Sequence, residues 1–206
     1  MYNRCRNCGT FSPDKKVWDH YIECPVCGYK EPFKKLPIIC LTGACGAGKT
    51  TVGLELAANY NGVITLEGDI VWIPEIDNTP ETDYRKFRER ILRMAKNIAQ
   101  SGKPVLITGC TTPGQFEECE ERKFVGNIYY IAIVCDKDVL AKRLFNRDHC
   151  SEDFIQGQIQ FNQWFIDNYN QYEPNIILID NNQDTPDDVA KKVQKAIDRI
   201  LLEENS

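Results

Sequence analysis

The sequence lacks long apolar runs. Its longest apolar stretch, residues 128–135, has the length of a strand, whereas a membrane-spanning helix needs about 20 apolar residues. The first five residues, Met-Tyr-Asn-Arg-Cys, contain no apolar segment of a secretory signal. The sequence also has no internal repeat and no low-complexity tract. We therefore expect a cytoplasmic globular protein without a membrane-spanning segment.

Histidine is scarce, with two in 206 residues, whereas cysteine is abundant, with ten. Four cysteines form the pairs Cys5-x-x-Cys8 and Cys24-x-x-Cys27, which are separated by 15 residues. This spacing is typical of a structural zinc site, in which four thiolates surround the ion and leave no open position. The alternatives are two disulfides, two coincidental pairs, or His20 as a substitute ligand. A reducing compartment with one zinc site fits this pattern best.

Residues 1–35 are predicted to form a separate zinc ribbon. A segment of this size is too small to fold on burial alone, so metal binding would supply its stability. Gly9 and Gly28 each follow a cysteine pair, where a positive φ helps the turn. The segment resembles zinc ribbons in general, which implies a small β-hairpin module. Residues 30–37, with two prolines, are expected to be a short linker to a second domain at 36–206.

Charge is unevenly distributed along the chain. Residues 1–35 carry seven Lys/Arg against four Asp/Glu, a balance of +3, and the remainder carries 18 against 26, a balance of −8. Four thiolates and a zinc ion would lower the first balance to about +1. A nucleic-acid partner is therefore possible but not favoured.

A glycine-rich motif follows residues 38–42, a short apolar segment of strand type. The motif fits G-x-x-x-x-G-K-[ST] at every fixed position and precedes a predicted helix at residues 51–60. Backbone N–H groups of such a loop bind phosphates, and the lysine and threonine contact the β/γ-phosphates and Mg²⁺. The predicted ATP-binding residues are Gly43, Ala44, Cys45, Gly46, Ala47, Gly48, Lys49, Thr50 and Thr51, with Thr50 as the magnesium ligand. A turn that binds nothing is the alternative. Cys45 is interpreted as a small neutral filler, with a redox switch as the alternative.

Strand and helix patterns alternate through the rest of the chain. Further strands are predicted at 63–66, 105–108, 128–134 and 175–179, and helices at 81–100, 137–147, 152–169 and from Pro186 onward. Thr185 is the expected N-cap of the last helix. Short apolar strands joined by helices predict an α/β fold, with a parallel sheet covered on both faces.

In such a sheet, ligands bind at the carboxyl ends of the strands. Glu67 and Asp69 follow the second strand, and the loop at residues 109–114 follows the third. Arg143 and Arg147 share one helical face after the fourth strand, where the alternative is a solvated surface. We expect strand alternation to let only one of the two carboxylates face the ligand, and favour Asp69 because Gly68 marks the strand end.

With these features, residues 36–202 resemble the P-loop small-molecule kinases, the family of adenylate, shikimate, gluconate and adenylylsulfate kinases. The resemblance rests on the glycine motif, on residues 66–69 and on residues 139–147. It implies a five-stranded sheet of order 2-3-1-4-5 and transfer of the ATP γ-phosphoryl group to an acceptor hydroxyl. The catalytic residues it implies are Lys49, Asp69, Arg143 and Arg147, with Arg143 also contacting ATP and residues 181–185 bordering the base.

The sequence departs from the family pattern at the third strand, residues 105–109, which lacks a terminal aspartate. Metal support is therefore expected from Thr50, Asp69 and water, or through Thr108.

The acceptor is expected between the helix at 81–100, the loop at 110–114 and the segment after the arginines. Candidate lining residues, each equally suited to an ordinary core, are Trp72, Tyr84, Arg88, Phe161, Asn162 and Trp164. The predicted function is phosphorylation of a small nucleoside- or sugar-like metabolite. The alternatives are a polynucleotide 5′-hydroxyl kinase and a non-catalytic ATP-binding switch that acts through the ribbon.

Overall fold

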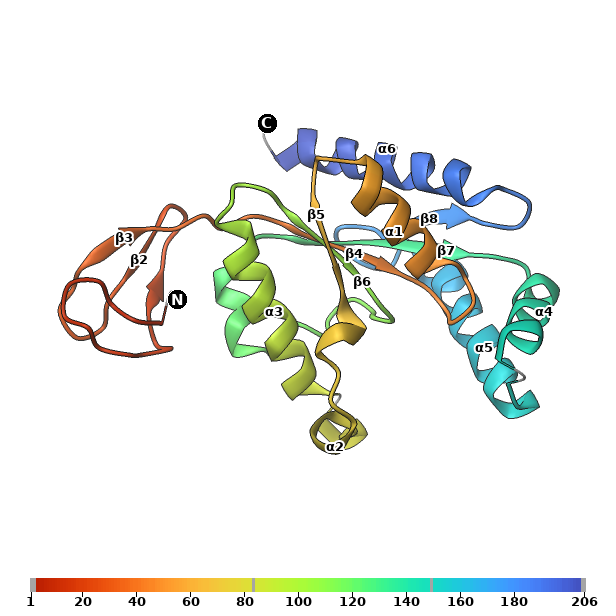
Figure 1. Ribbon diagram of the computed structural model, residues 1–206, viewed down its shortest axis with the longest axis horizontal. Coiled ribbons are helices and arrows are strands. Elements are labelled where there is room, and N and C mark those ends of the chain that lie inside the picture. Colours follow the sequence, from red (N-terminus) through yellow and green to blue (C-terminus); the bar gives the residue numbers. More distant parts are fainter. Residues whose placement is uncertain (1–2, 83, 149, 205–206) are drawn as a thin grey trace.

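The computed structural model describes residues 3–82, 84–148 and 150–204, and it contains two separate sheets (Figure 1). The larger sheet has five parallel strands in the order β5-β6-β4-β7-β8. Counted along the chain, this is the expected order 2-3-1-4-5. The strands are β4 (Ile38–Thr42), β5 (Ile64–Glu67), β6 (Val105–Thr108), β7 (Ile128–Val134) and β8 (Ile177–Asp180).

Helices cover both faces of this sheet, as expected from strands that are apolar throughout (Figure 1). Alternate residues of β4 point to opposite faces. Ile39 and Leu41 pack with α1 (Lys49–Asn59) and α6 (Pro186–Glu204). Ile38 and Cys40 pack in the opposite core, together with α3 (Arg85–Ala99) and α5 (Glu152–Asn168). Two cores therefore hold the strand ends in fixed positions.

The segment before α3 differs from the prediction of one helix over residues 81–100. A short helix α2 (Pro74–Asp77) and a 3₁₀ turn (Pro80–Thr82) come first, and α3 begins only at Arg85. Tyr84, which was expected on the apolar stripe of that helix, has a positive φ of 56° and lies just outside it. Asp77, the last residue of α2, is fully buried and pairs with Arg90 of α3. The sequence pattern missed this tertiary contact.

The N-terminal segment forms a three-stranded antiparallel sheet of β1 (Lys16–Val17), β2 (Tyr21–Glu23) and β3 (Lys30–Pro32). Its apolar core consists of Ile22, Phe33 and partly buried Val17, and it is completed by Phe124 of the larger body. The rings of Phe33 and Phe124 lie 5.9 Å apart in an edge contact. The small sheet therefore shares its apolar core with the body.

Polar contacts also join the two sheets. The backbone of Lys34 donates to and accepts from the side chain of Gln100, at 2.8 Å each. Lys96 is buried at this junction, where it pairs with Glu121, contacts Asn3 at 3.3 Å and lies over the Phe124 ring. The prediction of a linker over residues 30–37 was wrong at its start, because Lys30–Pro32 form strand β3, and Lys34 is held to α3 through Gln100. The division into domains 1–35 and 36–206 stays a prediction.

Among the described residues, no helix combines the length and the apolar composition needed to cross a membrane.

Candidate active site

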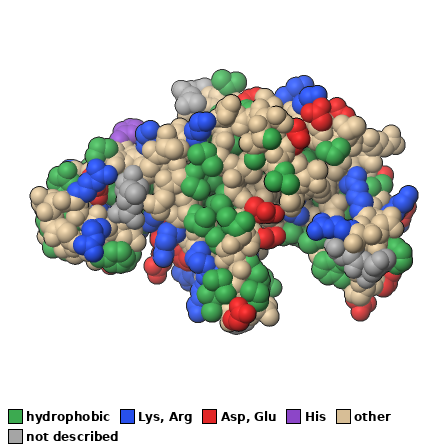
Figure 2. Space-filling view, in the orientation of Figure 1, with side chains coloured by type: hydrophobic (Ala, Val, Ile, Leu, Met, Phe, Trp, Pro, Cys, Tyr) green, Lys and Arg blue, Asp and Glu red, His purple; other side chains and the backbone are tan. Residues whose placement is uncertain are grey.

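A cavity of about 750 Å³ lies at the carboxyl ends of the central strands. Figure 2 shows the surface hollowed between two lobes, one built from α2 and α3 and the other from α4 (Lys137–Asp148) and α5. Glycine-loop residues, carboxylates and arginines all line this cavity. The strand-end rule therefore located it correctly.

Six of the nine predicted ATP-binding residues line the cavity: Cys45, Gly46, Gly48, Lys49, Thr50 and Thr51. The other three loop residues, Gly43, Ala44 and Ala47, do not line the cavity, and the two alanine side chains are fully buried. Their side chains therefore support the loop from the core side. Only their backbone groups remain for phosphate binding.

The glycines of the loop are required by backbone conformation and by space. Gly43, Gly46 and Gly48 have φ values of 136°, 82° and 109°, which L side chains rarely adopt. A Cβ at Gly43 would lie 2.4 Å from the Ile133 carbonyl oxygen, and one at Gly48 would lie 2.9 Å from Asn181 Nδ2. Gly48 is the N-cap of α1, so the helix N-terminus opens toward the cavity.

Lys49 lies folded over its own loop. Its ammonium donates hydrogen bonds to the carbonyl oxygens of Gly43, at 3.0 Å, and Ala44, at 2.9 Å. These two carbonyls hold the positive charge of Lys49 beside the loop. The side chain needs only to exchange these carbonyls for phosphate oxygens to bind a nucleotide.

Both carboxylates after β5 line the cavity, which corrects the expectation that only one could do so. The strand ends at Glu67, and residues Gly68–Val71 form a 3₁₀ turn. The expectation was wrong because residues i and i+2 of a strand point to the same face, so alternation does not separate Glu67 from Asp69, and because Asp69 lies beyond the strand. Glu67 contacts the expected magnesium ligand, because Thr50 Oγ1 donates to its Oε1 at 3.5 Å. Asp69 is exposed on the same side.

The end of β6 contains no carboxylate, as the sequence showed. Thr108 is buried and lines the cavity, and its methyl group occupies the space beside Gly53 of α1. Thr42 at the end of β4 binds the next loop instead, donating to the Thr111 carbonyl at 2.6 Å and accepting from its N–H at 3.0 Å. Glu67 is therefore the acidic group beside Thr50.

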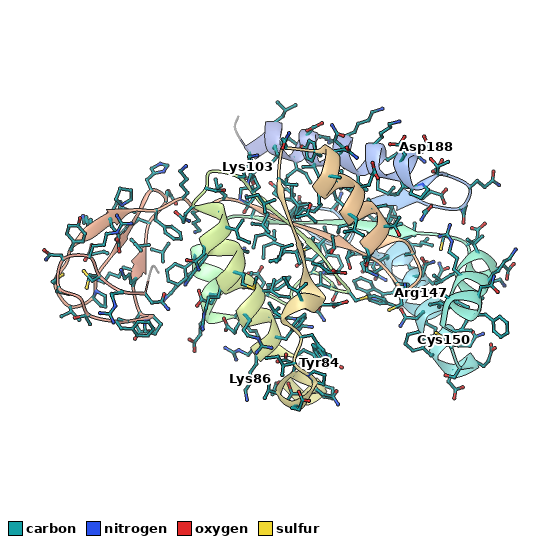
Figure 3. All side chains as sticks on the ribbon, in the orientation of Figure 1. Tyr84, Lys86, Lys103, Arg147, Cys150 and Asp188 are labelled. Atoms are coloured by element: carbon teal, nitrogen blue, oxygen red, sulfur yellow. The ribbon has the colours of Figure 1, made fainter. Side chains whose placement is uncertain are left out.

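Arg143 and Arg147 both line the cavity from α4, as their i, i+4 spacing predicted. Arg143 donates from Nη2 to the Asn181 carbonyl at 3.0 Å. Its Nη1 is buried and has no hydrogen-bond partner among the described residues. A buried donor without a partner on a cavity-lining arginine fits a site for an anion. Arg147 is exposed and lies on the α4–α5 lobe, facing the lobe that carries Tyr84 (Figure 3).

Two residues that hold the glycine loop were missed by sequence reasoning. Asn181, just after β8, is buried and donates to the Ala47 carbonyl at 2.7 Å. The strand-end rule could have identified it as more than a border residue. Gln158 of α5 accepts from the Cys45 N–H at 2.8 Å, and no sequence signal marks a glutamine within a helix.

Three of the predicted acceptor residues belong to the core instead. Asn162 is buried and uses its amide to bind both the N–H and the carbonyl of Cys135, at 3.2 and 2.8 Å. Phe161 and Trp164 pack against the α3–α5 side of the sheet. Trp72 and Tyr84 instead form an aromatic group at the start of α3, with ring centroids 5.9 Å apart.

A second cavity of about 310 Å³ lies between the start of α3 and the loop after β6. It is lined by Thr82, Arg85, Arg88, Pro113, Gly114, Gln115 and Glu118. The loop at residues 109–115 borders both cavities. Its first residues, 109 and 110, line the larger cavity, and its last residues, 113–115, line the smaller one. Two of the three segments expected around the acceptor line this cavity, and the segment after the arginines does not; Arg88 is the predicted acceptor residue found in its lining.

The four ribbon cysteines lie together, with all four Sγ atoms within 4.8 Å of one another. Cys5 Sγ is 3.7 Å from Cys27 Sγ, and Cys8 Sγ is 3.8 Å from Cys24 Sγ. A zinc–sulfur bond of about 2.3 Å gives tetrahedron edges of about 3.8 Å. The arrangement therefore fits a zinc ion and shows no S–S bond, which disfavours the two-disulfide alternative.

The turns around these cysteines favour the thiolates of Cys8 and Cys24, whereas the pKa of Cys5 is raised. Gly9 and Gly28 have the expected positive φ, 71° and 68°, and donate backbone hydrogen bonds to Cys5 and Cys24. Hydrogen bonds with Thr10 lower the pKa of Cys8 to about 6. The N–H groups of Cys27 and Val26 lower the pKa of Cys24. A lower pKa favours the thiolate form that binds metal. His20 is not part of the cluster.

The fold and the loop together define a P-loop nucleotide-binding protein. Residues 39–163 match the family described as AAA domain, and because this is more than half of the chain, the protein belongs to that family. No protein with curated annotation matches the sequence.

Solved kinase structures share the fold. A gluconokinase from Sinorhizobium meliloti 1021 aligns with a TM-score of 0.60 and 18% identity, over 82% of this chain and 97% of its own. A sugar kinase from Janibacter sp. HTCC2649 gives 0.57 and 17%, over 80% and 94%. A shikimate kinase from Acinetobacter baumannii, in complex with shikimate, gives 0.51 and 27%, over 79% and 93%. These likenesses confirm the expected resemblance to the P-loop small-molecule kinases.

Proposed function

We propose that the protein is an ATP-dependent kinase that phosphorylates a hydroxyl group of a small metabolite. One observation carries this proposal: the cavity of about 750 Å³ is lined by the P-loop, by Glu67 and Asp69 at the end of β5, and by two arginines from α4. Phosphoryl transfer needs positioned positive charge and a group that accepts the hydroxyl proton. A simple nucleotide switch needs neither the paired arginines nor a second carboxylate.

Each residue has a role that follows from its position. The P-loop N–H groups and Lys49 bind the β- and γ-phosphates, and Arg143 and Arg147 neutralise charge on the side of α4. Asp69, exposed at the cavity, accepts the proton of the acceptor hydroxyl. Thr50 and Glu67 would hold Mg²⁺, which supplies charge neutralisation when it is bound. Asn181 and Gln158 keep the loop in its phosphate-binding shape.

The smaller cavity is proposed to bind the acceptor. Two arginines, Arg85 and Arg88, outnumber the one carboxylate, Glu118, in its lining, which suits a compound that carries a carboxylate or phosphate as well as hydroxyl groups. The shikimate kinase that shares the fold was solved with a hydroxylated carboxylic acid bound. We therefore extend the prediction of a nucleoside- or sugar-like acceptor to sugar acids and other hydroxy acids.

The cysteine cluster is proposed to hold one structural zinc ion. Four sulfur ligands leave no position for substrate, so the ion stabilises the ribbon and takes no part in phosphoryl transfer. The ribbon packs on Phe124, and Phe124 ends the 3₁₀ segment Glu120–Phe124 that follows the acceptor-side loop. Zinc is thus expected to affect activity only through the stability of this junction.

The test is ATP consumption by the zinc-loaded protein with a panel of sugars, sugar acids, hydroxy acids, nucleosides and 5′-hydroxyl oligonucleotides. We expect one hydroxylated small molecule to stimulate ADP release, with phosphate transfer confirmed by mass spectrometry. Stimulation by oligonucleotides alone would replace the small-molecule proposal with a polynucleotide kinase. ATP binding without transfer to any panel member would favour the nucleotide switch.

A further inference from the structure

Two cysteines from separate loops meet beside the phosphate site. Cys45 lies within the P-loop and Cys110 within the loop after β6, 65 residues later, yet their Sγ atoms are 4.0 Å apart. Cys110 Sγ also lies 3.5 Å from the Gly43 carbonyl oxygen, the group that accepts from Lys49. Both cysteines line the large cavity. The proposed phosphoryl transfer uses neither thiol.

Both loops are held in place by hydrogen bonds, so this proximity is built into the fold. Gln158 binds the Cys45 N–H, and the Thr42 hydroxyl binds both backbone groups of Thr111, next to Cys110. Gln115 closes the same loop by accepting from the Thr112 N–H at 3.0 Å. Because a disulfide has an S–S length of about 2.05 Å, rotation of the two side chains must shorten the gap by about 2 Å.

The two thiols differ from most other cysteines of the body in access and in charge environment. Cys110 is exposed and Cys45 partly exposed, whereas Cys40, Cys119 and Cys135 are buried. The hydrogen bond with Cys45 and the positive charge of Lys49 lower the pKa of Cys110 to about 6, although burial of the thiol and the charge of Asp69 oppose this. The same hydrogen bond raises the pKa of Cys45. A thiolate beside a thiol, open to solvent, is the arrangement found in cysteines that respond to oxidants.

We propose that Cys45 and Cys110 form a reversible disulfide that inactivates the phosphate site. The oxidant is hydrogen peroxide: the Cys110 thiolate attacks one peroxide oxygen, the O–O bond breaks, and the leaving hydroxide takes a proton from solvent, which gives the sulfenic acid and one water. The Cys45 sulfur then attacks the sulfenic sulfur, and its proton leaves with the hydroxyl group as a second water. The two thiols are thereby oxidised by two electrons and the peroxide is reduced to two waters. A dithiol reductant reverses the bond by exchange.

The consequence for nucleotide binding rests on the proposed function. A bond from Cys45 to Cys110 holds the loop after β6 against the P-loop, at the carbonyl that Lys49 releases when it turns toward phosphate. Cys150 lines the same cavity and is partly exposed, so it is the competing partner for Cys45 (Figure 3). The pairing must therefore be measured directly.

The first experiment maps the bond and needs no activity. The zinc-loaded full chain is treated with hydrogen peroxide, free thiols are blocked with N-ethylmaleimide, and the tryptic peptides are sequenced without reduction. We expect a cross-link between the peptide of residues 36–49 and the peptide that contains Cys110, abolished by dithiothreitol. It should be absent in Cys110→Ser and Cys45→Ser and retained in Cys40→Ser, Cys119→Ser and Cys150→Ser. A link from Cys45 to Cys150, or oxidation of Cys110 without a link, overturns the proposal.

The second experiment measures the affinity of a non-hydrolysable ATP analogue by calorimetry, before oxidation, after it, and after reduction. We expect oxidation to weaken binding at least tenfold in the wild type, with full recovery, and to leave Cys110→Ser unaffected. A mapped disulfide with unchanged affinity overturns the inactivation. Failure of the kinase panel with an intact oxidation response removes only the proposed reaction. Thermal melting of each variant identifies any that fail to fold.

Discussion

The ribbon and the P-loop body are each stabilised in a different way. The five-stranded sheet lies between two apolar cores, each contributed by strands and helices far apart in the sequence. The ribbon has three strands of two or three residues, and its small core borrows Phe124 from the body. Burial therefore suffices for the body, whereas the ribbon depends on its four cysteines.

This difference assigns different roles to similar sequence features. Glycines and cysteines occur in both regions, but in the ribbon they shape and close a metal site. In the body they shape a phosphate site and place two thiols beside it. The following predictions separate the two regions, beginning with the largest effect.

Removal of zinc should unfold the ribbon and leave the body folded. Zinc binding contributes about 10 kcal/mol or more to the folding of small zinc modules, far more than the ribbon's apolar core can replace. Elemental analysis should give one zinc per chain, and Cys24→Ser should lose it. Hydrogen exchange should then show loss of protection in residues 16–32 and retained protection in β4, β6 and β7.

Ser12→Ala is the matched control, because Ser12 lies in the ribbon outside the cysteine cluster. It should retain zinc and protection. Loss of protection throughout the body of Cys24→Ser would show that the ribbon and the body fold as one unit.

Substitutions of Asp69 and of Glu67 should impair the proposed reaction in different ways. Asp69→Asn should lower kcat by about 10²–10⁴, since it removes the proposed proton acceptor, while the Kd for ATP stays within about twofold. Glu67→Gln should instead raise the Mg²⁺ concentration for half-maximal rate by about tenfold, because Glu67 lies beside Thr50. Steady-state kinetics over a Mg²⁺ series measures both. If only Glu67→Gln lowers kcat at saturating Mg²⁺, the proton acceptor is Glu67.

The sequence predicted the body better than the surroundings of its site, for a physical reason. Strand patterns such as residues 105–108 and the P-loop motif are local, and the structure confirms their positions. The pairing of buried Asp77 with Arg90 joins two residues whose spacing follows no regular pattern. The hydrogen bond from the P-loop to Gln158 joins segments that lie far apart in the sequence. Asn162 resembled an acceptor residue, yet it binds the backbone after β7. Local patterns contain no information about such contacts.

The free energy of unfolding should depend on the buried ion pair between Lys96 and Glu121 at the junction of the two regions. Lys96→Met leaves Glu121 buried with Arg93 as its remaining partner, at 2.9 Å. Loss of one member of a buried pair is expected to lower the free energy of unfolding by about 3 kcal/mol, measured by urea denaturation. Lys96→Met combined with Glu121→Gln should recover much of this loss. Lys123→Met is the control, because Lys123 lies over the same Phe124 ring but is exposed. Equal effects of both lysines would exclude the buried pair as the cause.

The smallest effect should come from a ribbon glycine, and it distinguishes conformation from space. Gly9 has a φ of 71°, but a Cβ there would meet no atom within 4 Å, so Gly9→Ala carries only the cost of the left-handed conformation. That cost is about 1–2 kcal/mol and should weaken zinc binding about tenfold, measured by chelator competition. Gly9→Asn should recover part of the loss, because asparagine tolerates this conformation. Gly43→Ala also places a Cβ 2.4 Å from a backbone oxygen and should abolish ATP binding without changing zinc affinity. Equal losses of zinc affinity in Gly9→Ala and Gly9→Asn would show that the turn does not require the left-handed conformation.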